Sequence, residues 1–396
     1  KILMLDGAMG TMIQQENLTA DDFGGEKYEG CNDYLVLQRP DVIKNIHKKY
    51  LEAGSDIIET NSFGALDIVL KDYDLEDTVF EMNKKAAELV NEAIAEYRSE
   101  HPEVTRNLYV AGALGPSNKS ISVTGGVTFE ELIHTYYTAV SGLMAGGVDL
   151  ILFETIQDTR NLKAAYLGLK KAMEENYTVP LMLSFTIEST GTTLAGQTAD
   201  AFYYAVNHMN PFSVGLNCAT GPEFMTQFLK TLNNISNTYI SVYPNAGLPN
   251  EDGEYEETPD TLSAKIEPFF QNNYLNIVGG CCGTTPEHIQ KIKEKSVNYS
   301  PRIIDENKDF NDVSGLISLE TPKDRPIYVG ERTNVIGSRI FKNLIASEKF
   351  DEATEVARLQ IKGRADVIDI CLANPDRDEI ADMKAFLDKV AKFAKV

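Results

Sequence analysis

The sequence predicts an α/β fold, a (β/α)8 TIM barrel followed by a linker and a truncated second α/β segment. Short apolar, β-rich runs recur through the first 300 residues, and each is followed by an amphipathic stretch of helix length. This alternation is expected of βα units around a parallel sheet. Eight such units in about 295 residues match the size of a single barrel. The structural rival is a doubly wound open sheet, which has fewer strands and one reversal of strand order.

Each predicted strand is a short apolar run bounded by polar or turn-forming residues. Between them, residues 77–98 and 129–145 repeat apolar side chains at helical spacing, which predicts helices packed on the sheet. In chain order the predicted strands are 2–5, 56–59, 108–112, 150–154, 181–186, 213–217, 240–243 and 276–279.

Polar side chains follow these strands at the point where each one ends. Asp6, Thr60, Glu154 and Cys218 each stand at or just after the end of a predicted strand, as do Asn245 and the pair Cys281 and Cys282. The carboxyl ends of barrel strands meet at one mouth, where active sites lie. The sequence therefore predicts one site built from several loops, with Thr60 among the residues that contact its substrate.

The cysteines indicate what this site binds. Adjacent Cys281 and Cys282 cannot close an ordinary disulfide without strain. With Cys218 they supply three thiolates, which suits a zinc ion that keeps its fourth position open for a substrate sulfur. Asn245 is a candidate for that position when substrate is absent. The alternatives are three buried apolar thiols or a closed structural zinc site, for which neither Cys31 nor Cys371 is well placed.

Composition limits the partners and the cellular compartment that are expected for this protein. The formal net charge of −22, with lysines and arginines scattered among acids, argues against a nucleic-acid or anionic-membrane partner. No apolar stretch is long enough to span a bilayer. An odd number of cysteines, 5 in 396 residues, predicts a reducing compartment, with cytoplasm as the default. The five histidines are expected in polar surroundings and have no predicted role.

Six segments together resemble the homocysteine S-methyltransferase family: Asp6–Thr11, Glu59–Phe63, Gly112–Pro116, Phe153–Thr155, Gly215–Cys218 and Gly279–Gly283. The resemblance covers residues 1–300. It implies that Cys218, Cys281 and Cys282 bind Zn2+, to which homocysteine coordinates through sulfur. It also implies that Asp6 and Glu154 hold the amino group of homocysteine, with backbone amides near Gly7 and Ala8 for the carboxylate. An ammonium group favours carboxylates, and glycine-rich amides suit a carboxylate.

A different pattern follows the predicted barrel. Residues 301–325 are rich in Asp, Asn and Pro, which predicts a linker. Residues 326–396 then begin a new βα pattern, and the run Gly330–Arg339 resembles the opening of the pterin-binding domain of cobalamin-dependent methionine synthase. The resemblance implies pterin-site roles for Glu331, Asn334 and Asp369, whereas Cys371 stands where that family usually has asparagine. Only two of eight βα units are present, so an incomplete site is expected.

The predicted function is zinc-dependent activation of homocysteine for methyl transfer, giving methionine. The expected donor is methylcobalamin, recharged from methyltetrahydrofolate through modules missing from this chain, because the cobalamin-binding Asp-x-His-x-x-Gly loop does not occur in it. The alternatives are a methyltransferase using a sulfonium or betaine donor and a non-catalytic zinc- or homocysteine-binding module. Schiff-base chemistry is disfavoured because no predicted strand end carries a lysine.

Overall fold

The computed structural model describes residues 1–250, 253, 255–305, 313–319 and 325–393. The chain divides into two compact units, Lys1–Lys308 and Asp309–Val396. Of the predicted linker, residues 306–312 and 320–324 lie outside the described residues. Residues within 313–319 form a short antiparallel pair, β9 (Val313–Ser314) and β10 (Ser318–Leu319), where the sequence predicted only irregular chain.

The first unit is built on an eight-stranded parallel sheet in the order β1-β8-β7-β6-β5-β4-β3-β2. A parallel bridge between Leu5 and Ile57 brings the two outer strands together, and the Asp56 amide donates to the Met4 carbonyl at 2.7 Å. The sheet therefore curls into a barrel, which confirms the predicted fold. The strands are β1 (Leu3–Met4), β2 (Ile57–Glu59), β3 (Tyr109–Leu114), β4 (Leu150–Ile156), β5 (Leu181–Phe185), β6 (Ser213–Asn217), β7 (Tyr239–Tyr243) and β8 (Ile277–Val278).

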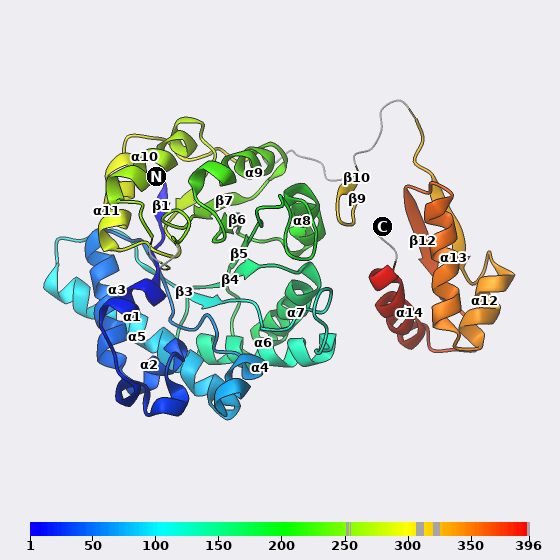
Figure 1. Ribbon diagram of the computed structural model, residues 1–396, viewed down its shortest axis with the longest axis horizontal. Coiled ribbons are helices and arrows are strands. Elements are labelled where there is room, and N and C mark those ends of the chain that lie inside the picture. The colour runs from blue at the N-terminus through cyan, green and yellow to red at the C-terminus, as the bar shows by residue number, and fades with distance from the viewer. Residues whose placement is uncertain (251–252, 254, 306–312, 320–324, 394–396) are drawn as a thin grey trace. The chain divides into compact units, whose positions relative to one another are not determined.

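Helices surround the ring of strands (Figure 1). Their starts follow from local chemistry: Thr128 closes a capping box with Glu131, and the Asp158 side chain accepts from the Arg160 amide. The helices are α1 (Met9–Gln15), α2 (Leu35–Gln38), α3 (Pro40–Ala53), α4 (Asp67–Leu70), α5 (Val79–Glu100), α6 (Phe129–Ala145), α7 (Thr159–Glu175), α8 (Ala199–Val206), α9 (Pro222–Ile235), α10 (Pro259–Gln271) and α11 (Pro286–Ser296).

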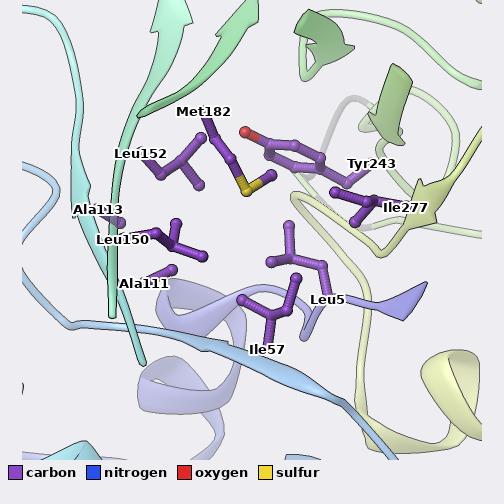
Figure 2. Close-up of a cluster of buried hydrophobic side chains, with 9 residues drawn as sticks. All are labelled: Leu5, Ile57, Ala111, Ala113, Leu150, Leu152, Met182, Tyr243 and Ile277. Carbon is purple, nitrogen blue, oxygen red and sulfur yellow. The ribbon is translucent and has the colours of Figure 1, made fainter. Parts of the chain in front are cut away.

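The barrel interior is a packed apolar core, which Figure 2 shows as side chains from most strands pointing toward one another. Such layers fill TIM barrels and leave no pore. β6 contributes Gly215, where an added Cβ would lie 2.0 Å from the Ser241 carbonyl oxygen. The cluster comprises Leu5, Ile57, Ala111, Ala113, Leu150, Leu152, Met182, Tyr243 and Ile277.

The second unit has a parallel pair of strands, β11 (Val329–Asn334) and β12 (Val367–Cys371), joined through α12 (Arg339–Ala346) and α13 (Phe350–Lys362) and followed by α14 (Glu379–Phe393). A small core around Phe341 and Phe386 holds it together. Within the described part of the chain, no helix combines the length and the apolarity needed to cross a membrane.

Candidate active site

The predicted site residues converge on one cavity of about 350 Å3. Its lining includes eight of the nine residues predicted to bind metal or substrate in the barrel, and the ninth, Asn245, is not part of it. The eight come from the ends of five strands far apart in the sequence, as expected where barrel loops meet. These residues are Asp6, Gly7, Ala8, Thr60, Glu154, Cys218, Cys281 and Cys282.

The three cysteine sulfurs form a compact cluster. All three Sγ atoms lie within 4.8 Å of one another, with Cys218 3.9 Å and Cys281 4.0 Å from Cys282. A tetrahedral ion with Zn–S distances of about 2.3 Å requires sulfurs about 3.8 Å apart. The cysteines therefore fit a single zinc ion with little movement. They are not lodged in separate apolar pockets, and Cys31 is buried elsewhere in the barrel.

The cluster also has an electrostatic asymmetry. Hydrogen bonds from Cys218 and Cys281 hold the pKa of the Cys282 thiol well below its usual range, while the contacts of Cys281 with Cys218 and Cys282 raise the pKa of the Cys281 thiol. One sulfur thus concentrates the negative charge of the group. A cation supplied to the cluster would favour the ionised form of all three, because metal binding deprotonates thiols.

Asn245 lies just after β7, between the loops that carry the cysteines. Its Oδ1 atom is buried and accepts no hydrogen bond from any described residue. The backbone amide of Asn245 donates to the Thr220 carbonyl at 3.4 Å, and the backbone amide of the next residue, Ala246, donates to the Cys282 carbonyl at 2.9 Å. A buried amide oxygen without a donor is costly, and a metal ion is one partner that would satisfy it.

Four carboxyl groups line the same cavity: those of Asp6, Glu59 and Glu154, and that of Asp33, which accepts from the Gly64 amide at 2.9 Å. Burial raises the pKa of Asp6, Glu59 and Glu154, that of Glu154 to about 8. Asp6 accepts from the Glu59 amide at 3.1 Å through Oδ2, while its Oδ1 is buried without a partner. The carboxyls of Glu59 and Glu154 accept no hydrogen bond from any described residue. Acceptors left open in this way suit a ligand that brings several donors, such as an ammonium group.

Asn217, fully buried at the end of β6, holds the neighbouring loops in place. Its Oδ1 accepts from the Thr155 amide at 3.0 Å and from the Ser184 hydroxyl at 2.6 Å, and its Nδ2 donates to Thr155 Oγ1 at 2.8 Å. Thr155 and Cys218 both adopt left-handed backbone conformations, with φ of 52° and 61°. Such conformations are uncommon for these residue types and persist only when the surroundings enforce them. The network therefore orients Glu154 and Cys218 together.

The loop after β1 is fixed against the loop after β8. The Ala8 amide donates to the Thr284 hydroxyl at 3.2 Å, and the Tyr50 hydroxyl donates to the Ala8 carbonyl at 3.1 Å. A Cβ on Gly7 would lie 2.8 Å from Thr284 Oγ1, so glycine permits this close packing. The amide of Ala8, predicted to bind a carboxylate, is therefore already used within the protein.

The end of β2 brings two residues into the cavity, Thr60, which had a predicted role, and Glu59, which had none. Thr60 was predicted to contact substrate, but its hydroxyl lies 2.5 Å from Ser62 Oγ and accepts from the Ala113 amide. Its neighbour Glu59, at the end of β2, adds a carboxyl to the cavity, although the sequence pattern gave Glu59 no predicted role. Asp33 and Tyr243 also line the cavity. Glu59 could have been found, since it ends a predicted strand as Glu154 does.

The pterin-site residues predicted in the second unit are only partly brought together. Asn334 Nδ2, at the end of β11, donates at 3.0 Å to Asp369 Oδ2, in the middle of β12. Glu331 lies earlier on β11 and is exposed. Their role in binding a pterin stays a prediction.

Comparison with known proteins agrees with the barrel and its site. The sequence profile of the family described as Homocysteine S-methyltransferase matches residues 3–296. The barrel is similar to the oxidized form of homocysteine methyltransferase MmuM from Escherichia coli, with a TM-score of 0.62 and 23% identity over 74% of this chain and 96% of that chain. The metallated form of that enzyme gives the same TM-score at 24% identity and the same coverage. The chain therefore belongs to the homocysteine S-methyltransferase family and is a methyltransferase.

Proposed function

We propose that the barrel activates homocysteine for methyl transfer to its sulfur, giving methionine, with zinc held by Cys218, Cys281 and Cys282. The observation that carries the proposal is one cavity that joins three converging thiols to the carboxyls of Asp6, Glu59 and Glu154. The thiols suit a thiophilic metal, and the carboxyls suit the ammonium of an amino acid. A substrate with a thiol at one end and an amino acid at the other fits both.

Each end of the cavity has a separate task. Bound zinc supplies Lewis-acid stabilisation that lowers the pKa of the homocysteine thiol. Asp6, Glu59 and Glu154 accept hydrogen bonds from the substrate ammonium and orient the sulfur toward the mouth. There the sulfur displaces the methyl carrier in line: the S–C bond forms as the bond between methyl and carrier breaks, and the carrier keeps that electron pair. Asn245 is the proposed fourth zinc ligand before substrate arrives.

For the methyl donor we propose methylcobalamin, presented by a cobalamin-binding module of a longer or separate protein and recharged from methyltetrahydrofolate. The support is the resemblance of Gly330–Arg339 to a pterin-binding domain, together with the contact between Asn334 and Asp369. The second unit has one pair of parallel strands among its described residues, so folate binding by this chain alone is not part of the proposal. A cytoplasmic location and the absence of a nucleic-acid partner stay predictions.

A direct assay distinguishes between the candidate methyl donors. Purified protein loaded with zinc is incubated with homocysteine and methylcobalamin, S-adenosylmethionine or glycine betaine, and methionine is measured by chromatography. Methionine from methylcobalamin, lost in Cys281→Ser, is the expected result. Turnover only with a sulfonium or betaine donor would identify the other class of methyltransferase. Homocysteine binding without methionine from any donor would indicate a non-catalytic module.

A further inference from the structure

Thr284 follows the thiol cluster in the loop after β8 and is fully buried. Its hydroxyl accepts a hydrogen bond from the Ala8 amide at 3.2 Å and donates one to the Cys281 carbonyl at 2.7 Å. Ala8 belongs to the loop after β1, which also carries Asp6, and Cys281 is a proposed metal ligand. One oxygen atom therefore connects the backbone of the thiol cluster to the backbone of a loop that carries a carboxyl of the site.

Two glycines leave the space that the Thr284 side chain occupies. An added Cβ would lie 2.8 Å from Thr284 Oγ1 at Gly7 and 2.4 Å from the same atom at Gly280. Both distances are too short for a carbon beside an oxygen, so a larger residue at either position would displace the hydroxyl. The loops after β1 and β8 are thus shaped around this one side chain.

Further hydrogen bonds join the same two loops. The Gly280 amide donates to the Asp6 carbonyl at 3.0 Å. The hydroxyl of Tyr50, fully buried on α3, lies within donating distance of the Ala8 carbonyl at 3.1 Å and of the Thr284 carbonyl at 3.3 Å. These buried contacts hold the two loops at a fixed separation.

We infer that Thr284, together with Tyr50, is a positioning residue that selects the length of the amino-acid thiol. The inference rests on the proposed function, in which the thiol cluster binds one end of the substrate and Asp6 binds the other. A ligand gains from its second contact only if its length matches the separation of the two groups. Cysteine is shorter than homocysteine by one methylene group. Loops held at a fixed separation therefore favour homocysteine, by about tenfold or more for one methylene.

The test removes the hydroxyl and keeps the shape of the side chain. Thr284→Val has this effect, and Thr284→Ser restores the hydroxyl without the methyl group. Thr135→Val is the matched control, because Thr135 is also buried but its hydroxyl donates to Asp67 Oδ1 at 2.6 Å, between α6 and α4. The full chain is loaded with zinc, and calorimetry measures the affinities for homocysteine, cysteine, 2-aminobutyrate and propanethiol. The last two ligands carry only the amino-acid end and only the thiol end.

In Thr284→Val we expect homocysteine to bind about fivefold more weakly or worse, as for the loss of a buried hydrogen-bonding group, and its advantage over cysteine to shrink. 2-Aminobutyrate and propanethiol should bind as they do to Thr135→Val, because each uses one end of the site alone. Thr284→Ser should keep the preference of the unaltered protein. Equal weakening of all four ligands, or an unchanged preference for homocysteine in Thr284→Val, would overturn the inference.

Tyr50→Phe gives an independent test if Thr284→Val does not fold, because it removes the other hydroxyl that joins the two loops. We expect it to lower the preference for homocysteine over cysteine by a smaller factor, and an unchanged preference there would overturn the inference. Failure of the unaltered, zinc-loaded protein to bind homocysteine would overturn the proposed function itself, and this inference with it.

Discussion

The Sγ atoms of Cys218 and Cys282 lie 3.9 Å apart although 64 positions separate the two residues in the chain. The first follows β6 and the second follows β8, with β7 between these strands in the sheet. The approach depends on the left-handed backbone of Cys218 and on Asn217 beneath it. The barrel thus brings together thiols that no local motif could join.

Replacing Asp6 by Asn tests the binding of the substrate ammonium. The amide oxygen can still accept from the Glu59 amide, but the charge is removed. We expect homocysteine binding to weaken by about 2 kcal/mol, as for loss of a charged hydrogen-bond partner, measured by calorimetry. Binding of 4-mercaptobutyrate, which lacks the amino group, should be unchanged. Equal weakening for both ligands would contradict a role in ammonium recognition.

At high pH, ionised Glu154 should lower the free energy of unfolding of the protein when no ligand occupies the cavity. Burial raises the pKa of Glu154 to about 8, whereas an unfolded chain ionises near the ordinary value of about 4.3. Between these values the folded state holds an extra proton, so stability falls as pH rises toward 8. We expect Glu154→Gln to unfold at higher denaturant concentration than the unaltered protein at pH 8.5, by roughly 2 to 4 kcal/mol, with a smaller gain at pH 5.

The same carboxyl should make ligand binding depend on pH. An ammonium pairs with ionised Glu154, so the proton held below pH 8 must leave on binding. Methionine is the better probe, because it has no thiol proton of its own. Its affinity should rise between pH 6 and pH 8 for the unaltered protein and stay flatter in Glu154→Gln. A parallel rise in both proteins would remove Glu154 as the cause.

His47, on α3, should make the barrel sensitive to acid. It is fully buried, and neither ring nitrogen has a partner among the described residues. Burial lowers its pKa to about 3, so below pH 6.5 the unfolded chain takes up a proton that the folded state refuses. Stability is therefore complete above pH 6.5 and decreases as pH falls toward 3.

His47→Leu should remove this dependence and stabilise the barrel at pH 5 by about 2 kcal/mol. Denaturant unfolding followed by circular dichroism measures it. His101→Leu is the control, since His101 lies half-exposed just after α5. If both variants show the acid sensitivity of the unaltered protein, His47 is not its source.

Arg302 should be needed for barrel stability although it lies beyond the predicted boundary at residue 300. Its buried guanidinium donates to Asn233 Oδ1 at 2.8 Å, to the Thr238 carbonyl at 2.9 Å and to the Ser236 carbonyl. Arg302→Ala would leave these carbonyls without their donor, so we expect a loss of about 3 kcal/mol in the free energy of unfolding. Arg98→Ala, on an exposed part of α5, should cost little; equal losses would contradict the assignment.

Much of the barrel follows from short-range sequence pattern. The predicted helix 129–145 and the predicted strand 213–217 match α6 and β6 end to end, because each has a clear period and polar boundaries. Strands β1 and β8 are shorter than predicted, since their flanking residues turn into the loops of the site. The predicted thiols meet because parallel strands end at one mouth.

Other features depend on the folded surroundings. His47 and His288 were expected in polar company but are buried, because the helix faces that carry them pack inward. The β9–β10 pair has only two residues in each strand, too few to show a period. The hydrogen bonds of Asn217 to Thr155 join residues on different loops, so no sequence period predicts them.

The most direct test of the account is X-ray absorption at the zinc edge, with metal analysis, on protein purified without chelator. We expect one zinc per chain, with three sulfur neighbours at about 2.3 Å and a fourth, lighter neighbour that homocysteine replaces with sulfur. Cys218→Ser should lose a sulfur neighbour or the metal itself. A metal-free protein, or a zinc surrounded by nitrogen and oxygen and unchanged by homocysteine, would contradict the account.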